Sequence, residues 1–390
     1  MKNEISSKIK STFRGTRFWF FIILIFSLST VFVFSADFLS YVEFYNSDKN
    51  IGYKEKEKIP PIMPLDKALY DKKINELANN PLDPIVYETI KTVENNESGK
   101  PVTKTKKVPV SPQPVVSHLW PVKTVYPNAG AILPFNRIVA YYGNLYSKNM
   151  GVLGQYSEDE MLSKLNTEVE KWNIADPETK VIPALHYIAV VAQEGAGQDG
   201  KYRIRMPDEE IEKIIKMAKK ISGLVFLDIQ VGLSDLQTEV PLLLKYLKMS
   251  EVHLGIDPEF SMKTGIRPGK IVGTLDASDI NFTAEYLAKI VKDNNLTPKI
   301  LVVHRYTEKM VTNYKEIKPL PEVQIVMDMD GWGGIPNKIS TYKQFIYKEP
   351  VQFTGFKLFY KNDVLDKSTT LMTPTDLLKL NPQPIYIQYQ

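Results

Sequence analysis

The sequence predicts an α/β protein, a TIM-type (β/α)8 barrel preceded by an N-terminal transmembrane helix and an extended stalk. Three observations support this prediction. A long uncharged run lies near the N-terminus, and a segment rich in Pro, Lys, Glu and Asn follows it. From about residue 131 onward, short β-rich runs alternate with amphipathic helical segments. This alternation is typical of a parallel sheet built from βα units.

The first part of the chain has the features of a membrane anchor. Residues 18–36 carry no charge, and their length approaches what a helix needs to cross a bilayer. Five basic residues precede them against Glu4 alone: Lys2, Lys8, Lys10, Arg14 and Arg17. The positive-inside bias therefore places residues 1–17 in the cytoplasm and the rest of the chain outside the cell membrane. A cleaved signal peptide is the alternative, but its apolar core is usually shorter and the possible cleavage site here is poor.

Residues 37–130 are expected to form an extracytoplasmic stalk. They show little periodic apolar pattern, so they cannot bury enough apolar surface to offset the entropy of ordering. A short helix over Leu65–Ala78 is the one regular element expected there. The stalk would hold the following domain away from the membrane.

Residues 131–390 have the size and the element order of a (β/α)8 barrel. Eight strands are predicted, at 137–142, 181–191, 223–230, 251–259, 270–276, 299–306, 323–330 and 353–360. Helices are predicted at 157–172, 207–220, 233–248, 278–293, 307–315 and 337–347. Residues 261–269 should be a bare loop, and 384–390 an additional extended piece beside the first strand. An open doubly wound sheet is disfavoured, because the first predicted strand is not followed by a good Gly-rich phosphate loop.

The predicted strands divide into an apolar row for the helices and a second row for the barrel interior. In the strand at 251–259, Val252, Leu254 and Ile256 form the apolar row. In every such strand the interior row becomes polar toward its carboxyl end, which is the catalytic end of a TIM barrel. Burying an unpaired carboxylate costs on the order of several kcal/mol, so the polarity of these positions favours a functional site. For single residues, helix capping or ion pairing with Lys357 or Arg305 is an equally good explanation.

Several motifs from Arg137 onward resemble a family of secreted or membrane-anchored bacterial barrel proteins. They are AYYGNLYSKNMGVLG, VIPALHYIAVVAQ, LDIQ, LGIDPEF, VVHRYT, MDMDGWG and GFKLFY. The resemblance implies the barrel fold and no particular activity. More loosely, the acids on the fourth and seventh predicted strands resemble the layout of retaining glycoside hydrolases. Those enzymes carry Asn-Glu and Glu at these places, whereas this chain has Asp-Pro-Glu and Asp. The Asp257-x-Glu259 motif is similar to that of lysozyme-like barrels that cleave cell walls.

We therefore predict a membrane-anchored glycoside hydrolase acting on a cell-envelope or extracellular polysaccharide through two carboxylates. Glu259 is expected to be the general acid and Asp330 the nucleophile or the base for water, while Asp257 and Asp328 shift their pKa values. The expected substrate-binding residues are Tyr141 (or its neighbour Tyr142), His186, Asp228, Gln230, His304, Tyr306, Trp332 and Lys357.

Two alternatives to this prediction stay open. His186, His304 and the aspartates Asp228, Asp257 and Asp328 are ligand types of metal-dependent hydrolases, although no H-x-H or H-E-x-x-H motif is present and the chain has only four histidines. A non-catalytic glycan-binding protein could use the same barrel. We expect neither a cofactor nor a bound metal. The formal net charge of +4 and the dispersed basic residues give no support for nucleic-acid binding, and the absence of cysteine excludes thiolate sites and disulfides.

Overall fold

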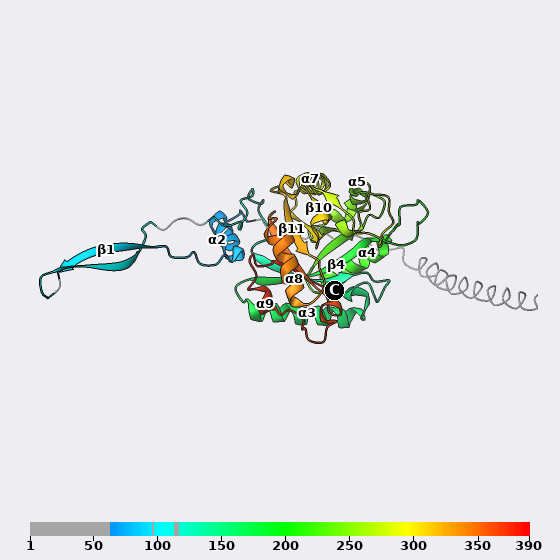
Figure 1. Cartoon of the computed structure of the whole chain (residues 1–390). Coiled ribbons are helices and arrows are strands. Elements are labelled where there is room, and N and C mark those ends of the chain that lie inside the picture. The colour runs from blue at the N-terminus through cyan, green and yellow to red at the C-terminus, as the bar shows by residue number, and fades with distance from the viewer. Residues whose placement is uncertain (1–62, 96, 113–116) are drawn as a thin grey trace, which may run out of the picture. The chain divides into compact units, whose positions relative to one another are not determined.

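The computed structural model describes residues 63–95, 97–112 and 117–390. Within these residues the largest sheet has the strand order β3-β13-β12-β11-β9-β7-β6-β4-β5, and β3 also pairs with β4. The ring from β3 to β4 is parallel at every step, while β5 (Arg203–Arg205) is an antiparallel addition to β4. The chain therefore forms the closed, eight-stranded TIM-type barrel that the sequence predicts (Figure 1).

The barrel strands are β3 (Asn136–Gly143), β4 (Lys180–Ala192), β6 (Leu224–Ile229), β7 (Val252–Ile256), β9 (Lys299–Arg305), β11 (Val323–Met329), β12 (Phe353–Leu358) and β13 (Tyr386–Tyr389). The helices of the described chain are α2 (Lys67–Ala78), α3 (Glu158–Ala175), α4 (Asp208–Lys220), α5 (Leu236–Glu239), α6 (Leu244–Leu247), α7 (Ala277–Asn294), α8 (Ile335–Tyr342) and α9 (Pro374–Leu377). Acidic residues fill the first turns of α3 and α4, where they complement the positive end of the helix dipole.

Two predicted helices differ from the observed structure. The helix expected at 233–248 is divided into α5, a 3-10 turn (Val240–Leu243) and α6, because Pro241 cannot donate an interior helical hydrogen bond. Residues 307–315 form no α-helix. They contain two 3-10 turns (Glu308–Met310 and Tyr314–Glu316) and the two-residue strand β10 (Val311–Thr312), and Asn313 adopts a left-handed conformation with φ of 56° that no helix accommodates.

One predicted strand is wrong, and its replacement changes the strand numbering of the site. Residues 270–276 lie outside the barrel: Ile271 and Val272 are exposed, and only β8 (Leu275–Asp276) pairs, with β10. Between β7 and this segment the chain forms a 3-10 turn (Pro258–Phe260) and loops, with no helix to carry it across the outside of the barrel to a neighbouring parallel strand. The barrel is closed instead by β13, which pairs with β12 and β3. The strand that ends in Asp328 and Asp330 is therefore the sixth of the barrel, so the resemblance to the strand-four and strand-seven layout of retaining glycoside hydrolases is lost.

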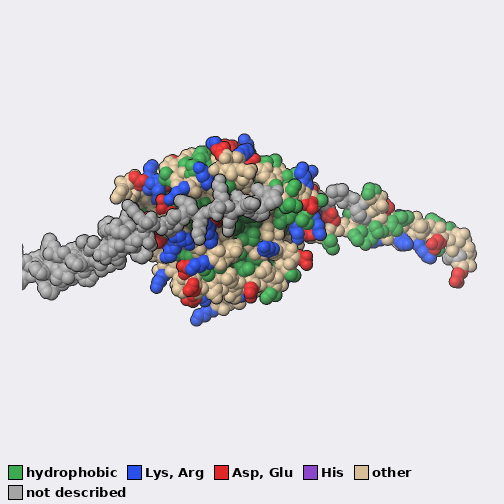
Figure 2. Space-filling model, turned by 180° about the vertical axis from the view of Figure 1, so that it is seen from behind, with side chains coloured by type: hydrophobic (Ala, Val, Ile, Leu, Met, Phe, Trp, Pro, Cys, Tyr) green, Lys and Arg blue, Asp and Glu red, His purple; other side chains and the backbone are tan. Residues whose placement is uncertain are grey.

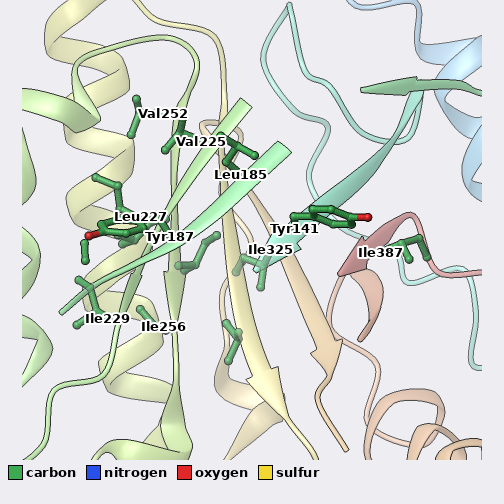
Figure 3. Close-up of a cluster of buried hydrophobic side chains, with 14 of the residues drawn as sticks. Tyr141, Leu185, Tyr187, Val225, Leu227, Ile229, Val252, Ile256, Ile325 and Ile387 are labelled. Atoms are coloured by element: carbon green, nitrogen blue, oxygen red, sulfur yellow. The ribbon is translucent and has the colours of Figure 1, made fainter. Parts of the chain in front are cut away.

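The alternation of side chains along the strands follows the predicted rows. Val225, Leu227 and Ile229 of β6 belong to the large hydrophobic cluster between strands and helices, as do Val252 and Ile256 of β7. Figure 3 shows these side chains together with those of neighbouring strands. Burial of this layer holds the helices on the outside of the barrel and fixes the register, since a one-residue slip would exchange the two rows.

A second cluster fills the amino-terminal half of the barrel interior. It contains Leu224, Phe226, Ile300, Val302 and Val326, together with Tyr70 of α2. α2 is capped by Asp66, which accepts a hydrogen bond from Leu69 N at 2.9 Å, and Asn79 beyond its end donates to Leu380 O at 2.8 Å. This helix, expected within the stalk, thus packs against the barrel. Trp120 also contacts it, donating from Nε1 to Tyr347 O at 3.0 Å.

Elsewhere in the predicted stalk, β1 (Tyr87–Asn95) and β2 (Pro101–Pro109) form an exposed antiparallel hairpin. Residues 18–36, the predicted membrane anchor, lie outside the described residues. None of the helices in the described part of the chain is long and apolar enough to span a membrane. On the face drawn in Figure 2, lysine and arginine side chains are interspersed with acidic ones.

Candidate active site

The carboxyl ends of the barrel strands bring one polar group after another into the interior. Most predicted site residues meet here: His186 from β4, Asp228 and Gln230 at the end of β6, Asp257 after β7, His304 from β9, Asp328 and Asp330 at the end of β11, and Lys357 from β12. Each of these side chains is buried. Because the strands are parallel and adjacent, residues far apart in sequence contact one another here.

His304 lies at the centre of this group. Its Nδ1 is 3.3 Å from both Asp328 Oδ2 and Asp330 Oδ2, and its Nε2 is 3.5 Å from Asp228 Oδ1. Burial alone would lower the pKa of His304, but Asp228 and then the other two carboxylates raise it well above its ordinary value. At neutral pH the imidazole ring is therefore positively charged unless another cation takes its place.

A hydrogen-bonded chain joins β3, β6 and β7 across the interior. The Tyr142 hydroxyl donates to Asp228 Oδ2 at 2.9 Å, and Gln230 Nε2 donates to Asp257 Oδ2 at 3.2 Å. Gln230 Oε1 accepts from Ala192 N at 3.1 Å, which fixes the orientation of the amide. Burial raises the pKa of Asp257 well above its usual range; the charge of His304 acts against this shift, and the charges of Asp228, Glu259 and Asp330 add to it. Asp257 is thus held as a neutral acid or shares a proton with its neighbours.

Asp330 is held by a cation. Lys357 Nζ lies 2.9 Å from Asp330 Oδ1 and 3.8 Å from the centre of the Tyr142 ring, so the ammonium group is fixed by an ion pair and a cation–π contact. Burial opposes ionisation of Asp330, but Lys357 and then His304 keep its pKa below the ordinary value. Asp328, which has no lysine partner among the described residues, has a raised pKa because of burial.

Glu259 is the most accessible of the four predicted catalytic carboxylates. It lies in a 3-10 turn (Pro258–Phe260) directly after β7, and its backbone N–H donates to Asp257 Oδ1 at 3.1 Å. Burial, and next the charge of Asp330, raise the pKa of Glu259, while Tyr306 and Lys357 act in the opposite direction. Glu259 and Asp330 therefore influence one another at the mouth of the barrel, in contrasting surroundings.

Two predicted substrate-binding residues do not belong to this group. Tyr141 is buried in the outer cluster of Figure 3, and its hydroxyl lies 3.1 Å from that of Tyr360. It is the neighbouring Tyr142, on the opposite face of β3, that enters the interior. Trp332 follows β11 and is 61% exposed, so it contributes to the surface beyond the strand end rather than to the buried network.

Four further residues complete the site and were not predicted. Tyr386 and Gln388 of β13 contact His186, with Tyr386 OH at 2.6 Å and Gln388 Nε2 at 3.0 Å from His186 Nδ1. Gly255 and Gly355 make room for the acids: a Cβ at Gly255 would collide with His186 Nε2 and Asp228 Oδ1, and one at Gly355 with Asp328 Oδ1. A glycine inside a strand often marks such a close approach, and that signal was present in the sequence.

Comparisons with known proteins give no family for the chain. No protein-family model matches it. No curated protein matches it either. Among solved structures, dihydropteroate synthase of Burkholderia cenocepacia, in complex with 7,8-dihydropteroate, aligns over 66% of this chain and 86% of its own, with 7% identity and a TM-score of 0.29.

Proposed function

We propose that the barrel is a glycoside hydrolase in which Glu259 is the general acid and Asp330 is the nucleophile or the base that activates water. The observation that carries the proposal is that two carboxylates at the mouth of the barrel have different surroundings. Asp330 is ion-paired with Lys357 at 2.9 Å, whereas the partly exposed Glu259 forms no ion pair with any described residue. One carboxylate stabilised as an anion and one free to carry a proton are the minimal equipment for cleaving a glycosidic bond.

The remaining residues fit around this pair. Asp257 and Asp328 each lie two residues before a member of the pair. The charge of Asp330 favours retention of the proton on Glu259, and Glu259 in turn helps to raise the pKa of Asp257. Tyr306 and Gln230 provide hydrogen-bonding groups of the kind that bind sugar hydroxyls. The exposed indole of Trp332 offers a stacking surface for a sugar ring.

The proposed substrate is a polysaccharide of the cell envelope or the extracellular space. This part of the proposal depends on the sequence of residues 1–36, in which basic residues precede an uncharged run long enough to anchor the chain. With the N-terminus inside and the barrel outside, the substrates within reach are glycans rather than cytoplasmic metabolites.

The direct test is the release of reducing ends from cell-wall polysaccharide by the purified full-length protein. Glu259→Gln removes the proton donor and should lower turnover by about 10²- to 10⁴-fold. Glu285→Gln, which removes an exposed carboxylate from α7 on the outside of the barrel, is the matched control and should leave turnover unchanged. The proposal is wrong if Glu259→Gln is as active as the native protein, or if the native protein binds glycan in a pull-down assay and releases no product.

A further inference from the structure

Three buried polar atoms face one another below the proposed catalytic pair. His186 Nε2 lies 3.4 Å from Asp228 Oδ1, and His304 Nε2 lies 3.5 Å from the same oxygen. All three side chains are completely buried. Their ligand-type atoms lie within 4.8 Å of one another.

These three atoms are not satisfied by one another. Hydrogen bonds from imidazole nitrogen to carboxylate oxygen are normally about 2.7–3.2 Å long. The distances here are longer, and none of the three atoms has a hydrogen-bond partner in the described part of the chain. Leaving one buried polar atom unpaired costs about 1–3 kcal/mol, so three unpaired atoms within 4.8 Å of one another indicate a group that bridges them.

Two of the three spacings among these atoms match those between the ligands of a metal ion. Ligand bonds to Zn²⁺ are about 2.0–2.2 Å long, and in a tetrahedron this places neighbouring ligand atoms about 3.3–3.6 Å apart. The two distances to Asp228 Oδ1, 3.4 and 3.5 Å, fall in that interval. Two imidazole nitrogens and one carboxylate oxygen are also a typical ligand set of zinc sites that keep one position for water.

The atoms behind two of the three ligands are held by a hydrogen bond. The Tyr142 hydroxyl donates to Asp228 Oδ2 at 2.9 Å, and Tyr386 OH lies 2.6 Å from His186 Nδ1. On the far side of the His304 ring, Nδ1 lies 3.3 Å from carboxylate oxygens of Asp328 and Asp330 and makes no hydrogen bond within the described residues. Where Nδ1 donates to such a hydroxyl or carboxylate, the imidazole carries no proton on Nε2 and can present that nitrogen to an ion.

We propose that His186 Nε2, Asp228 Oδ1 and His304 Nε2 bind one divalent transition-metal ion, with Zn²⁺ as the best-matched ion. Gly255 supports this site by its missing side chain, because a Cβ there would occupy the space directly beside His186 Nε2 and Asp228 Oδ1. The three ligands are positioning residues for the proposed catalytic pair, since His304 connects the ion to Asp330. The sequence alone gave no metal-binding motif, because the ligands come from three different strands.

Metal content of the full-length protein tests this inference directly. Protein stripped with a chelator and dialysed against Zn²⁺ should contain about one ion per chain. Loaded with Co²⁺ instead, it should show the visible absorption of a tetrahedral site with nitrogen ligands. His186→Gln and Asp228→Asn should abolish the Co²⁺ spectrum and weaken binding more than the 10- to 100-fold typical of an outer-shell change. His253→Gln removes a buried histidine of the same barrel that lies outside the cluster, so it should retain the metal.

If a ligand variant does not fold, two other measurements still test the inference. Tyr142→Phe keeps the three ligands and removes the hydroxyl that supports Asp228 and contacts Gln230, so it should weaken Zn²⁺ binding by about 10- to 100-fold. The native Co²⁺ spectrum needs no variant at all. The inference is overturned if the native protein binds no Zn²⁺ or Co²⁺, as expected for a bridging water, or if folded His186→Gln binds them as tightly as the native protein.

The inference and the proposed function can fail separately. Native protein that releases reducing ends but binds no metal refutes the metal site and leaves the hydrolase standing. Protein that binds one Zn²⁺ and yields no product from any glycan refutes the hydrolase and leaves the metal site standing.

Discussion

The two halves of the barrel interior are built from the same strands and differ completely in chemistry. The amino-terminal half is filled by aliphatic and aromatic side chains such as Phe226 and Val302, with α2 packed against it. Two residues further along the same strands, the interior positions are Asp228 and His304. The apolar half stabilises the fold, and this stabilisation offsets the cost of burying the charges of the polar half.

The largest expected effect on folding comes from the apolar half. Phe226 packs against His186 with ring centres 5.3 Å apart, and also against His253 and Tyr386. Phe226→Ala should lower the free energy of unfolding by about 3–5 kcal/mol, because the cavity that it leaves cannot collapse within a closed barrel. Chemical denaturation measures this change. Trp332→Ala, which truncates a 61% exposed aromatic, should change stability by no more than about 0.5 kcal/mol. Equal losses in the two variants would contradict the division between the halves.

The boundary between the halves can be disturbed with one methyl group. Gly255→Ala forces a Cβ against His186 and Asp228 and should cost about 1–3 kcal/mol of stability. The same change should displace the two side chains and reduce both Zn²⁺ binding and turnover. Gly195→Ala adds a methyl group in open space and should be close to neutral. A Gly255→Ala protein with native stability would show that the side chains above it are not closely packed.

The features that could be predicted from the sequence are those that depend on periodicity. The alternation of apolar and polar residues in 223–230 and 323–330 identified both strands and the faces of their side chains, because one face of each strand had to meet the helices. Short patterns were ambiguous. Residues 270–276 have a β-rich composition but no crossover before them, while β13 is short and lies at the end of the chain. Taking the first for a barrel strand displaced Asp330 from the sixth strand to the seventh.

The sequence predicted most of the residues that belong to the site, but not which of their atoms contact one another. The alternation of side chains along each strand placed Asp228, His304 and Asp328 at one end of the barrel interior. It does not say which of their atoms face one another. For Tyr141 and Tyr142 even the face was open, since both strand rows of β3 are aromatic there. The metal cluster depends on contacts between β4, β6 and β9, and such contacts leave no local spacing to be recognised in the sequence.

The pH dependence of turnover should report the proton on Glu259. Burial and the neighbouring Asp330 raise the pKa of Glu259, so it stays protonated to higher pH than an ordinary glutamate. Activity that needs this proton is present below the raised pKa and should fall by about tenfold per pH unit above it. The residual turnover of Glu259→Gln should not show this decrease at high pH. A decrease at an unchanged pH in that variant would assign it to another acid, with Asp257 as the next candidate.

The smallest effect separates two adjacent tyrosines on opposite faces of β3. Tyr141→Phe removes a hydroxyl that lies 3.1 Å from that of Tyr360 in the outer layer, so it should cost about 0.5–1.5 kcal/mol of stability and leave turnover unchanged. Tyr142→Phe removes the donor to Asp228 Oδ2 and a contact of Gln230, both inside the polar half. It should lower turnover with a similar or smaller loss of stability. Parallel measurements of kcat/KM and of denaturation midpoints test this, and a Tyr141→Phe protein with reduced turnover would place the working surface on the wrong side of the strand.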